Sequence, residues 1–122
     1  MTRDQEWLND ALAAFDLLYF EGELERRKIK VKWADIRADN RSERFVFGTY
    51  YRKTVRVNRK LAQDWVPSYV VLYTIYHECL HALVARTHNL TFQLAEARYI
   101  HHTKAELWER ENIDRLCAQE TP

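Results

Sequence analysis

The sequence predicts an α+β fold in a single domain that covers residues 1–122. Three observations predict it: a helical apolar stripe near the N-terminus, three short segments suited to strands, and a long apolar segment followed by further helical patterns. A chain of 122 residues with 47% hydrophobic residues can bury one modest core. We therefore expect an N-terminal helix, a small three-stranded twisted sheet, a long helix and C-terminal helices.

The first helix is expected over residues 4–20. Apolar side chains recur there at the spacing of one helical face, at Leu8, Leu12, Phe15 and Tyr19. Asp4 is suited to cap the N-terminus, and Gly22 is suited to end the helix.

Three strands are expected next. Residues 28–36 alternate between apolar and lysine side chains, which is typical of a half-buried strand. Residues 44–52 and 54–58 are predicted to form a hairpin that turns at Lys53, although the turn lacks an Asn-Gly pair. The polar segment RADNRSER separates the first strand from this hairpin and is predicted to be a loop.

The second half of the chain is predicted to be helical. Pro67 and Ser68 mark the start of a long helix that continues to about Arg86. A break follows near RTHN, and another helix is expected over residues 90–99. A last helix is expected over residues 103–117, with Thr103 as its cap and Glu106 three residues later.

Charge and cysteine content suggest the environment of the protein. The net charge is +1 and the sequence pI is about 7.8, so a nucleic-acid partner is possible but is not supported by charge. Two cysteines, Cys79 and Cys117, are too few for a disulfide framework and are expected to be reduced, in the cytoplasm. The N-terminus lacks the apolar run of a signal peptide, and no apolar run is long enough to span a membrane.

The long apolar segment contains the pattern His-Glu-x-x-His, formed by His77, Glu78 and His81. Positions i and i+4 share one face of a helix, so two imidazoles can bind one Zn²⁺ ion at ~2.0–2.1 Å. Glu78 can then accept a proton from a water molecule at the site. The alternative is a polar patch satisfied by protein atoms, although such groups are costly to bury in an apolar helix.

A zinc site that keeps one position open needs a third protein ligand. Downstream donors are His88, Glu96, and the pair His101 and His102. The spacing leaves these alternatives open. The metzincin pattern is excluded, because the glycine and histidine that it requires are replaced by Val84 and Thr87.

Several segments share features with one group of enzymes. They are LLYFEGEL, FGTYYRKTVRVNRKL, VLYTIYHECLHALV, HNLTF, FQLAEARY and AELWERENIDRL. Over most of its length the chain resembles the SprT-like and minimal gluzincin (minigluzincin-type) zinc metallopeptidases. The resemblance implies His77 and His81 as zinc ligands and Glu78 as general base. It implies His88 as third ligand because it opens HNLTF, whereas the related gluzincins would place Glu96 there.

We therefore expect a zinc-dependent peptidase that acts on a peptide or protein substrate. The hairpin can offer a strand edge to an extended substrate, with Gly48 and Tyr50 as substrate-binding residues. Gly48 either permits close approach of the substrate or marks a bulge. Two other functions stay open: a non-catalytic zinc-containing module that binds peptides or proteins, and a DNA-associated SprT-type protease. The resemblance also raises the possibility that the C-terminal residues 119–122 fill the cleft.

Overall fold

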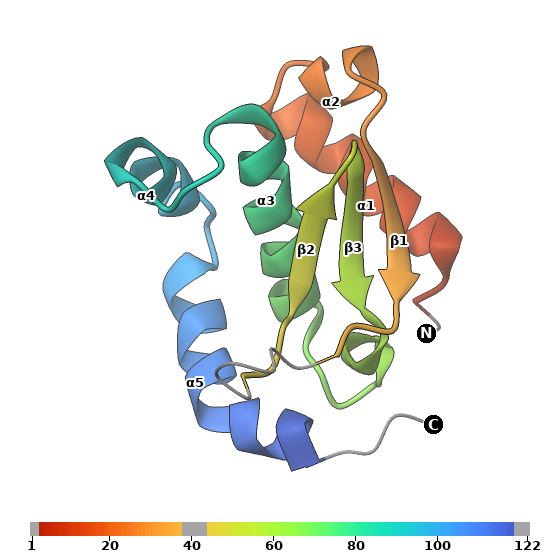
Figure 1. Ribbon diagram of the computed structural model, residues 1–122, viewed down its shortest axis with the longest axis vertical. Helices are drawn as coiled ribbons and strands as arrows, with labels where there is room; N and C mark the ends of the chain where they lie inside the picture. Colours follow the sequence, from red (N-terminus) through yellow and green to blue (C-terminus); the bar gives the residue numbers. More distant parts are fainter. Residues whose placement is uncertain (1–2, 38–43, 119–122) are drawn as a thin grey trace.

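A computed structural model describes residues 3–37 and 44–118, and it confirms the predicted α+β fold (Figure 1). Most of the predicted polar loop and the C-terminal residues 119–122 lie outside the described part. The described elements follow in this order: α1 (Gln5–Tyr19), α2 (Glu23–Arg26), β1 (Lys30–Ala34), β2 (Gly48–Tyr51), β3 (Thr54–Asn58), the 3₁₀ helix η1 (Arg59–Ala62), α3 (Ser68–Leu83), α4 (Leu90–Glu96) and α5 (His102–Ala118).

The sheet has the strand order β1-β3-β2, with β1 parallel and β2 antiparallel to β3. The predicted hairpin is therefore confirmed, but its first strand begins at Gly48 and not at residue 44. The turn residues Arg52 and Lys53 have φ values of 46° and 65°. Two positive φ angles are characteristic of a type I′ turn, which suits the twist of a hairpin even without Asn-Gly.

The ends of α1 agree with the sequence only in part. Asp4 caps the helix as predicted, because its carboxylate accepts the backbone N–H of Trp7 at 2.9 Å. The chain leaves the helix through two residues with positive φ, Glu21 at 51° and Gly22 at 82°. Gly22 is also the N-cap residue of α2, a one-turn helix that the sequence pattern did not predict.

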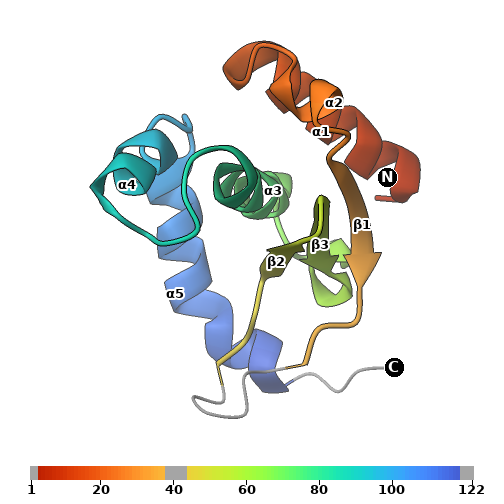
Figure 2. The same ribbon diagram turned by 45° about the horizontal axis from the view of Figure 1, so that its top comes forward.

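Helix α3 lies at the centre of the structure. Figure 2 shows it end on, with the sheet on one side, α1 and α2 on another, and α4 and α5 on a third. Its side chains are buried around most of its circumference, which explains the long apolar segment without a clear polar face. The helix ends at Leu83, three residues before the predicted end.

The two C-terminal helices differ slightly from their predicted bounds. Asn89 caps α4 by accepting the backbone N–H of Phe92 at 2.9 Å, and the helix ends at Glu96 rather than residue 99. Helix α5 begins at His102, so Thr103 is its second residue and not its cap. This early end of α4 and early start of α5 bring Glu96 and His102 close together.

Two findings bear on the predicted environment. Among the described residues, no helix combines the length and hydropathy needed to cross a membrane. Both cysteines are free, with Cys79 buried in α3 and Cys117 exposed near the end of α5. Burial raises the pKa of the Cys79 thiol, with a smaller contribution from the carboxylate of Glu78, so this thiol is held in its neutral form.

Candidate metal centre

Three histidines converge between α3 and α4. His77 and His81 lie one turn apart on α3, and His88 lies in the segment that leads to α4. The Nε2 atom of His88 lies 3.2 Å from Nε2 of His77 and 3.1 Å from Nε2 of His81. All three donor atoms lie within 4.8 Å of one another. The sequence pattern predicted His77 and His81, and the structure places beside them His88, the third ligand that the resemblance implies.

This arrangement fits a zinc ion. Tetrahedral ligands at ~2.0–2.1 Å from zinc are about 3.3 Å apart, close to the observed separations. Glu96 contacts Nδ1 of His77, and the backbone oxygen of Ala85 lies 3.1 Å from Nδ1 of His81. Both Nδ1 atoms can therefore carry the proton and leave the Nε2 lone pairs facing the other imidazoles. A cation between the rings would satisfy these converging lone pairs. The three rings cannot all satisfy one another, because an unprotonated Nε2 has no proton to donate.

Local packing holds His88 in position. The side chain of Gln93 donates a hydrogen bond to the backbone oxygen of His88 at 2.9 Å, and the Asn89 cap fixes the next residue. The ring of Phe92 is fully buried and lies 4.6 to 5.0 Å, between ring centroids, from all three imidazoles. Phe92 thus anchors α4 in the core and forms an apolar floor beneath the histidines.

Glu78 lies beside the histidines and is only 6% exposed. Its Oε2 atom is 3.9 Å from Nε2 of His77, so the carboxylate faces the same space as the converging imidazoles. Burial raises the pKa of Glu78 to about 7, while the charge of His77 opposes this rise and that of Glu96 adds to it. A carboxyl group poised near neutrality can both accept and return a proton.

The histidines and Glu78 line a hollow of about 600 Å³ whose opposite wall is β2. Residues 48–52 line it, including Tyr50, which is half-buried. Because β2 pairs only with β3 among the described strands, its outer edge has backbone groups available for an extended chain. Gly48 and Tyr50 are thus at the predicted place, beside the candidate centre.

A second hollow of about 290 Å³ adjoins His77 and Glu78 on the side of α5. It is lined by Tyr73, Glu96, Glu106 and Glu109, and the sequence analysis assigned only Glu96 a possible role at the site. The sequence does contain a pattern that could have indicated this hollow. Glu106 follows His102 by four residues, and Glu109 follows Glu106 by three. This spacing puts all three on one helical face.

The other candidate ligands lie elsewhere. Glu96 contacts His77 at Nδ1, behind the ring, and its side chain is 15% exposed. His102 contacts Glu106 and lies 3.6 Å from Glu96, while the exposed His101 packs near the ring of Tyr69. Among the described histidines beyond His81, only His88 reaches the Nε2 atoms of the His-Glu-x-x-His pair.

Ionisation of His77 and Glu96 is coupled through this contact. Burial acts to lower the pKa of His77, but the hydrogen bond and charge of Glu96 and the charge of Glu78 outweigh it, and the pKa is raised. Burial acts to raise the pKa of Glu96, but the hydrogen bond and charge of His77 outweigh it, and the pKa is lowered. For His81, burial lowers the pKa, which favours the neutral form that binds metals.

Gly48 is required by the packing of β2 against α3. A Cβ atom there would lie 2.8 Å from Cγ2 of Thr74, 2.9 Å from the backbone oxygen of Arg56 and 3.3 Å from Cγ of Glu78. The register of β2 on β3 is continuous from Gly48 to Tyr51, so the alternative that Gly48 marks a bulge is wrong. Its missing side chain lets the strand approach Glu78.

We expect Gly48→Ala to destabilise the protein by about 1–3 kcal/mol, because the added methyl group overpacks this contact. Urea unfolding followed by circular dichroism measures the change. The matched control is Gly48→Ala combined with Thr74→Ser, which removes the closest clashing atom and should recover part of the loss. Unchanged stability of the single variant would contradict the packing role of Gly48.

Glu109 makes the stability of the zinc-free protein depend on pH. Burial raises its pKa to about 8, while the charge of His77 opposes the rise. The folded state therefore keeps the proton between about pH 4.5 and 8, where the unfolded state has lost it, so stability falls as pH rises. Glu109→Gln removes this loss. It should be more stable than wild type by on the order of 4 kcal/mol at pH 8.5, with little difference at pH 4.5.

Thermal unfolding at these two pH values, in the presence of a chelator, measures the effect. The exposed Glu111→Gln provides a matched control that should show no growing difference. A difference between wild type and Glu109→Gln that stays constant with pH would contradict the buried, protonated state of Glu109.

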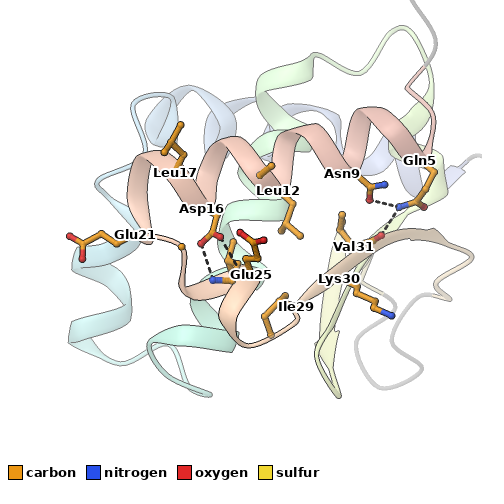
Figure 3. A pocket seen from close by; sticks show the side chains of 13 residues that line it. Gln5, Asn9, Leu12, Asp16, Leu17, Glu21, Glu25, Ile29, Lys30 and Val31 are labelled. Atoms are coloured by element: carbon orange, nitrogen blue, oxygen red, sulfur yellow. Dashed lines mark hydrogen bonds between the residues drawn. The ribbon is translucent and has the colours of Figure 1, made fainter.

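A separate, apolar hollow lies away from the candidate centre, between α1, α2 and β1 (Figure 3). Its volume is about 570 Å³, and its described lining includes no histidine. The buried Asp16 within it accepts the backbone N–H groups of Leu24 and Glu25 at 2.8 and 3.1 Å. This carboxylate therefore caps the N-terminus of α2.

Comparisons with protein-family models, with curated proteins and with solved structures found no match. The resemblance to SprT-like and minimal gluzincin peptidases stays a prediction. The functional argument therefore depends on the donor atoms, the buried carboxylate and the edge strand described above.

Proposed function

We propose that the protein is a zinc-dependent peptidase with its centre at His77, His81 and His88. One observation carries the proposal: three imidazole Nε2 atoms converge beside a buried glutamate, in a hollow walled by an edge strand. Neither the histidine cluster nor the strand edge alone would support a peptidase function. Together they provide metal ligands, a base and a surface for an extended chain.

The three histidines would hold the ion through Nε2. The Nδ1 partners, Glu96 for His77 and the backbone oxygen of Ala85 for His81, orient two of the rings. When bound, zinc supplies Lewis acidity, which polarises a carbonyl group and makes a water molecule a stronger acid. Three protein ligands would leave one coordination position open, as is usual in catalytic zinc sites.

Glu78 acts as the general base. It takes a proton from the attacking water, whose oxygen adds to the carbonyl carbon of the peptide bond, and then gives the proton to the leaving amine. The raised pKa of this buried carboxyl group suits both transfers. Gly48 keeps β2 close to Glu78, and the outer edge of β2 pairs with the backbone of the substrate.

The proposal predicts one zinc ion per chain and chelator-sensitive cleavage. Zinc is measured by elemental analysis of the purified protein, and cleavage is measured by mass spectrometry on a mixture of peptides. Chelation should abolish cleavage, and added zinc should restore it. One bound zinc without any cleavage would instead favour the non-catalytic binding module. Protein that binds no zinc would overturn both functions.

A further inference from the structure

The ring of His77 is contacted from both of its nitrogen atoms. Nε2 faces His88 at 3.2 Å, and Nδ1 contacts Oε2 of Glu96, the last residue of α4. The two nitrogens are separated by one ring carbon, and their in-plane directions diverge widely. Glu96 therefore lies behind the ring with respect to the proposed ion, where it can accept a hydrogen bond from Nδ1–H but does not join the ligand set.

Glu96 is itself held by side chains from α5 and α3. Its other carboxylate oxygen lies 3.6 Å from Nε2 of His102, which also contacts Oε1 of Glu106. The hydroxyl group of Tyr73 donates a hydrogen bond to the same Glu106 oxygen at 3.3 Å. A continuous series of contacts thus runs from the first turns of α5 to the candidate zinc ligand.

This inference rests on the proposed zinc site. We propose that Glu96, supported by His102, is a positioning residue for His77. It fixes the tautomer with the proton on Nδ1, so that the Nε2 lone pair points into the site, and it fixes the orientation of the ring. A carboxylate behind a ligating histidine also increases the basicity of the imidazole. The early end of α4 and early start of α5 are what bring these side chains together.

Two other roles for the same residues lead to different results. Glu96 could be the third zinc ligand in place of His88, with the observed contact to His77 broken. Alternatively, Glu96, His102 and Glu106 could hold a second cation, since their donor atoms also lie within 4.8 Å of one another. The observed contacts favour positioning, because each donor atom of this group already has a protein partner.

The first experiment measures zinc affinity by competition with a coloured chelator. Glu96→Ala should weaken zinc binding by about 10- to 100-fold, the effect typical of losing a partner of a metal-bound histidine. Glu96→Gln should recover part of this loss, because its amide oxygen can still accept from Nδ1–H. His102→Ala should cause a smaller loss than Glu96→Ala. The matched control is Glu109→Gln, in the same hollow, and its expected change is under threefold.

Two further readouts separate positioning from a general structural role. Nitrogen NMR of the imidazole rings should show His77 protonated at Nδ1 in wild type and a mixture of tautomers in Glu96→Ala. The absorption spectrum of the Co²⁺-substituted protein should keep its tetrahedral form in both, since the ligand set is unchanged. Circular dichroism of the chelator-treated variants checks that they are folded.

Four outcomes would overturn the inference. The first is wild-type zinc affinity in a folded Glu96→Ala variant. The second is a loss of zinc in Glu96→Ala with a changed Co²⁺ spectrum, while His88→Ala keeps wild-type affinity, which would make Glu96 the third ligand. The third is a second zinc ion in the wild-type protein that is lost in His102→Ala while the first ion is kept. The fourth, wild-type protein without zinc, would overturn the proposed function as well, whereas the first three leave it standing.

Discussion

Glu78→Gln should bind zinc like wild type and lose peptidase activity by about 10²- to 10⁴-fold, the range typical of a general base. The substitution keeps the size of the side chain, so its packing beside Gly48 is preserved. It removes the group that takes a proton from water. Because the amide does not titrate near neutral pH, raising the pH should not restore the activity of the variant.

The measurement is the initial rate of cleavage of one peptide substrate, with the zinc content of each sample determined in parallel. Glu111→Gln is the matched control, since it makes the same substitution at an exposed position of α5. Full activity of Glu78→Gln with zinc bound would refute the assigned base. Loss of zinc together with activity would show instead that Glu78 is needed to form the site.

The sequence predicted the parts of the site that depend on local geometry. His77 and His81 share a face because they are four residues apart in a helix, and no tertiary information is needed to see this. The strand over residues 54–58 was likewise predicted with its observed bounds, because its alternation is strong and it is central in the sheet. Both features are determined by residues close together in the sequence, within one or two helical turns or within one strand.

The parts that were not predicted depend on contacts between distant segments. Spacing alone could not choose between His88 and Glu96, because the choice depends on the path of the chain between α3 and α4. The Asn89 cap and the buried Phe92 fix that path. The bulge alternative for Gly48 was wrong for a similar reason: the need for glycine comes from Thr74 and Arg56. Helix α2 was missed because its first N–H groups are bonded by the carboxylate of Asp16 in α1, which no local pattern indicates.

His88→Ala should weaken zinc binding by roughly 10²-fold or more. Zinc sites with four protein ligands bind with roughly 10–16 kcal/mol, so one ligand corresponds to about 3 kcal/mol. The loss of zinc affinity should be large because Nε2 of His88 lies within 3.2 Å of the Nε2 atoms of both other histidines. Peptidase activity at limiting zinc should fall in parallel and recover partly when zinc is added in excess.

His101→Ala is the matched control for His88→Ala, because it removes another exposed imidazole that does not belong to the converging group. Chelator competition and elemental analysis compare the two variants. If His88→Ala kept wild-type affinity while Glu96→Ala lost zinc, the third ligand would be Glu96 and α4 would have to move toward the centre. If both kept it, two histidines and solvent would suffice to hold the ion, and the convergence of three rings would have another cause.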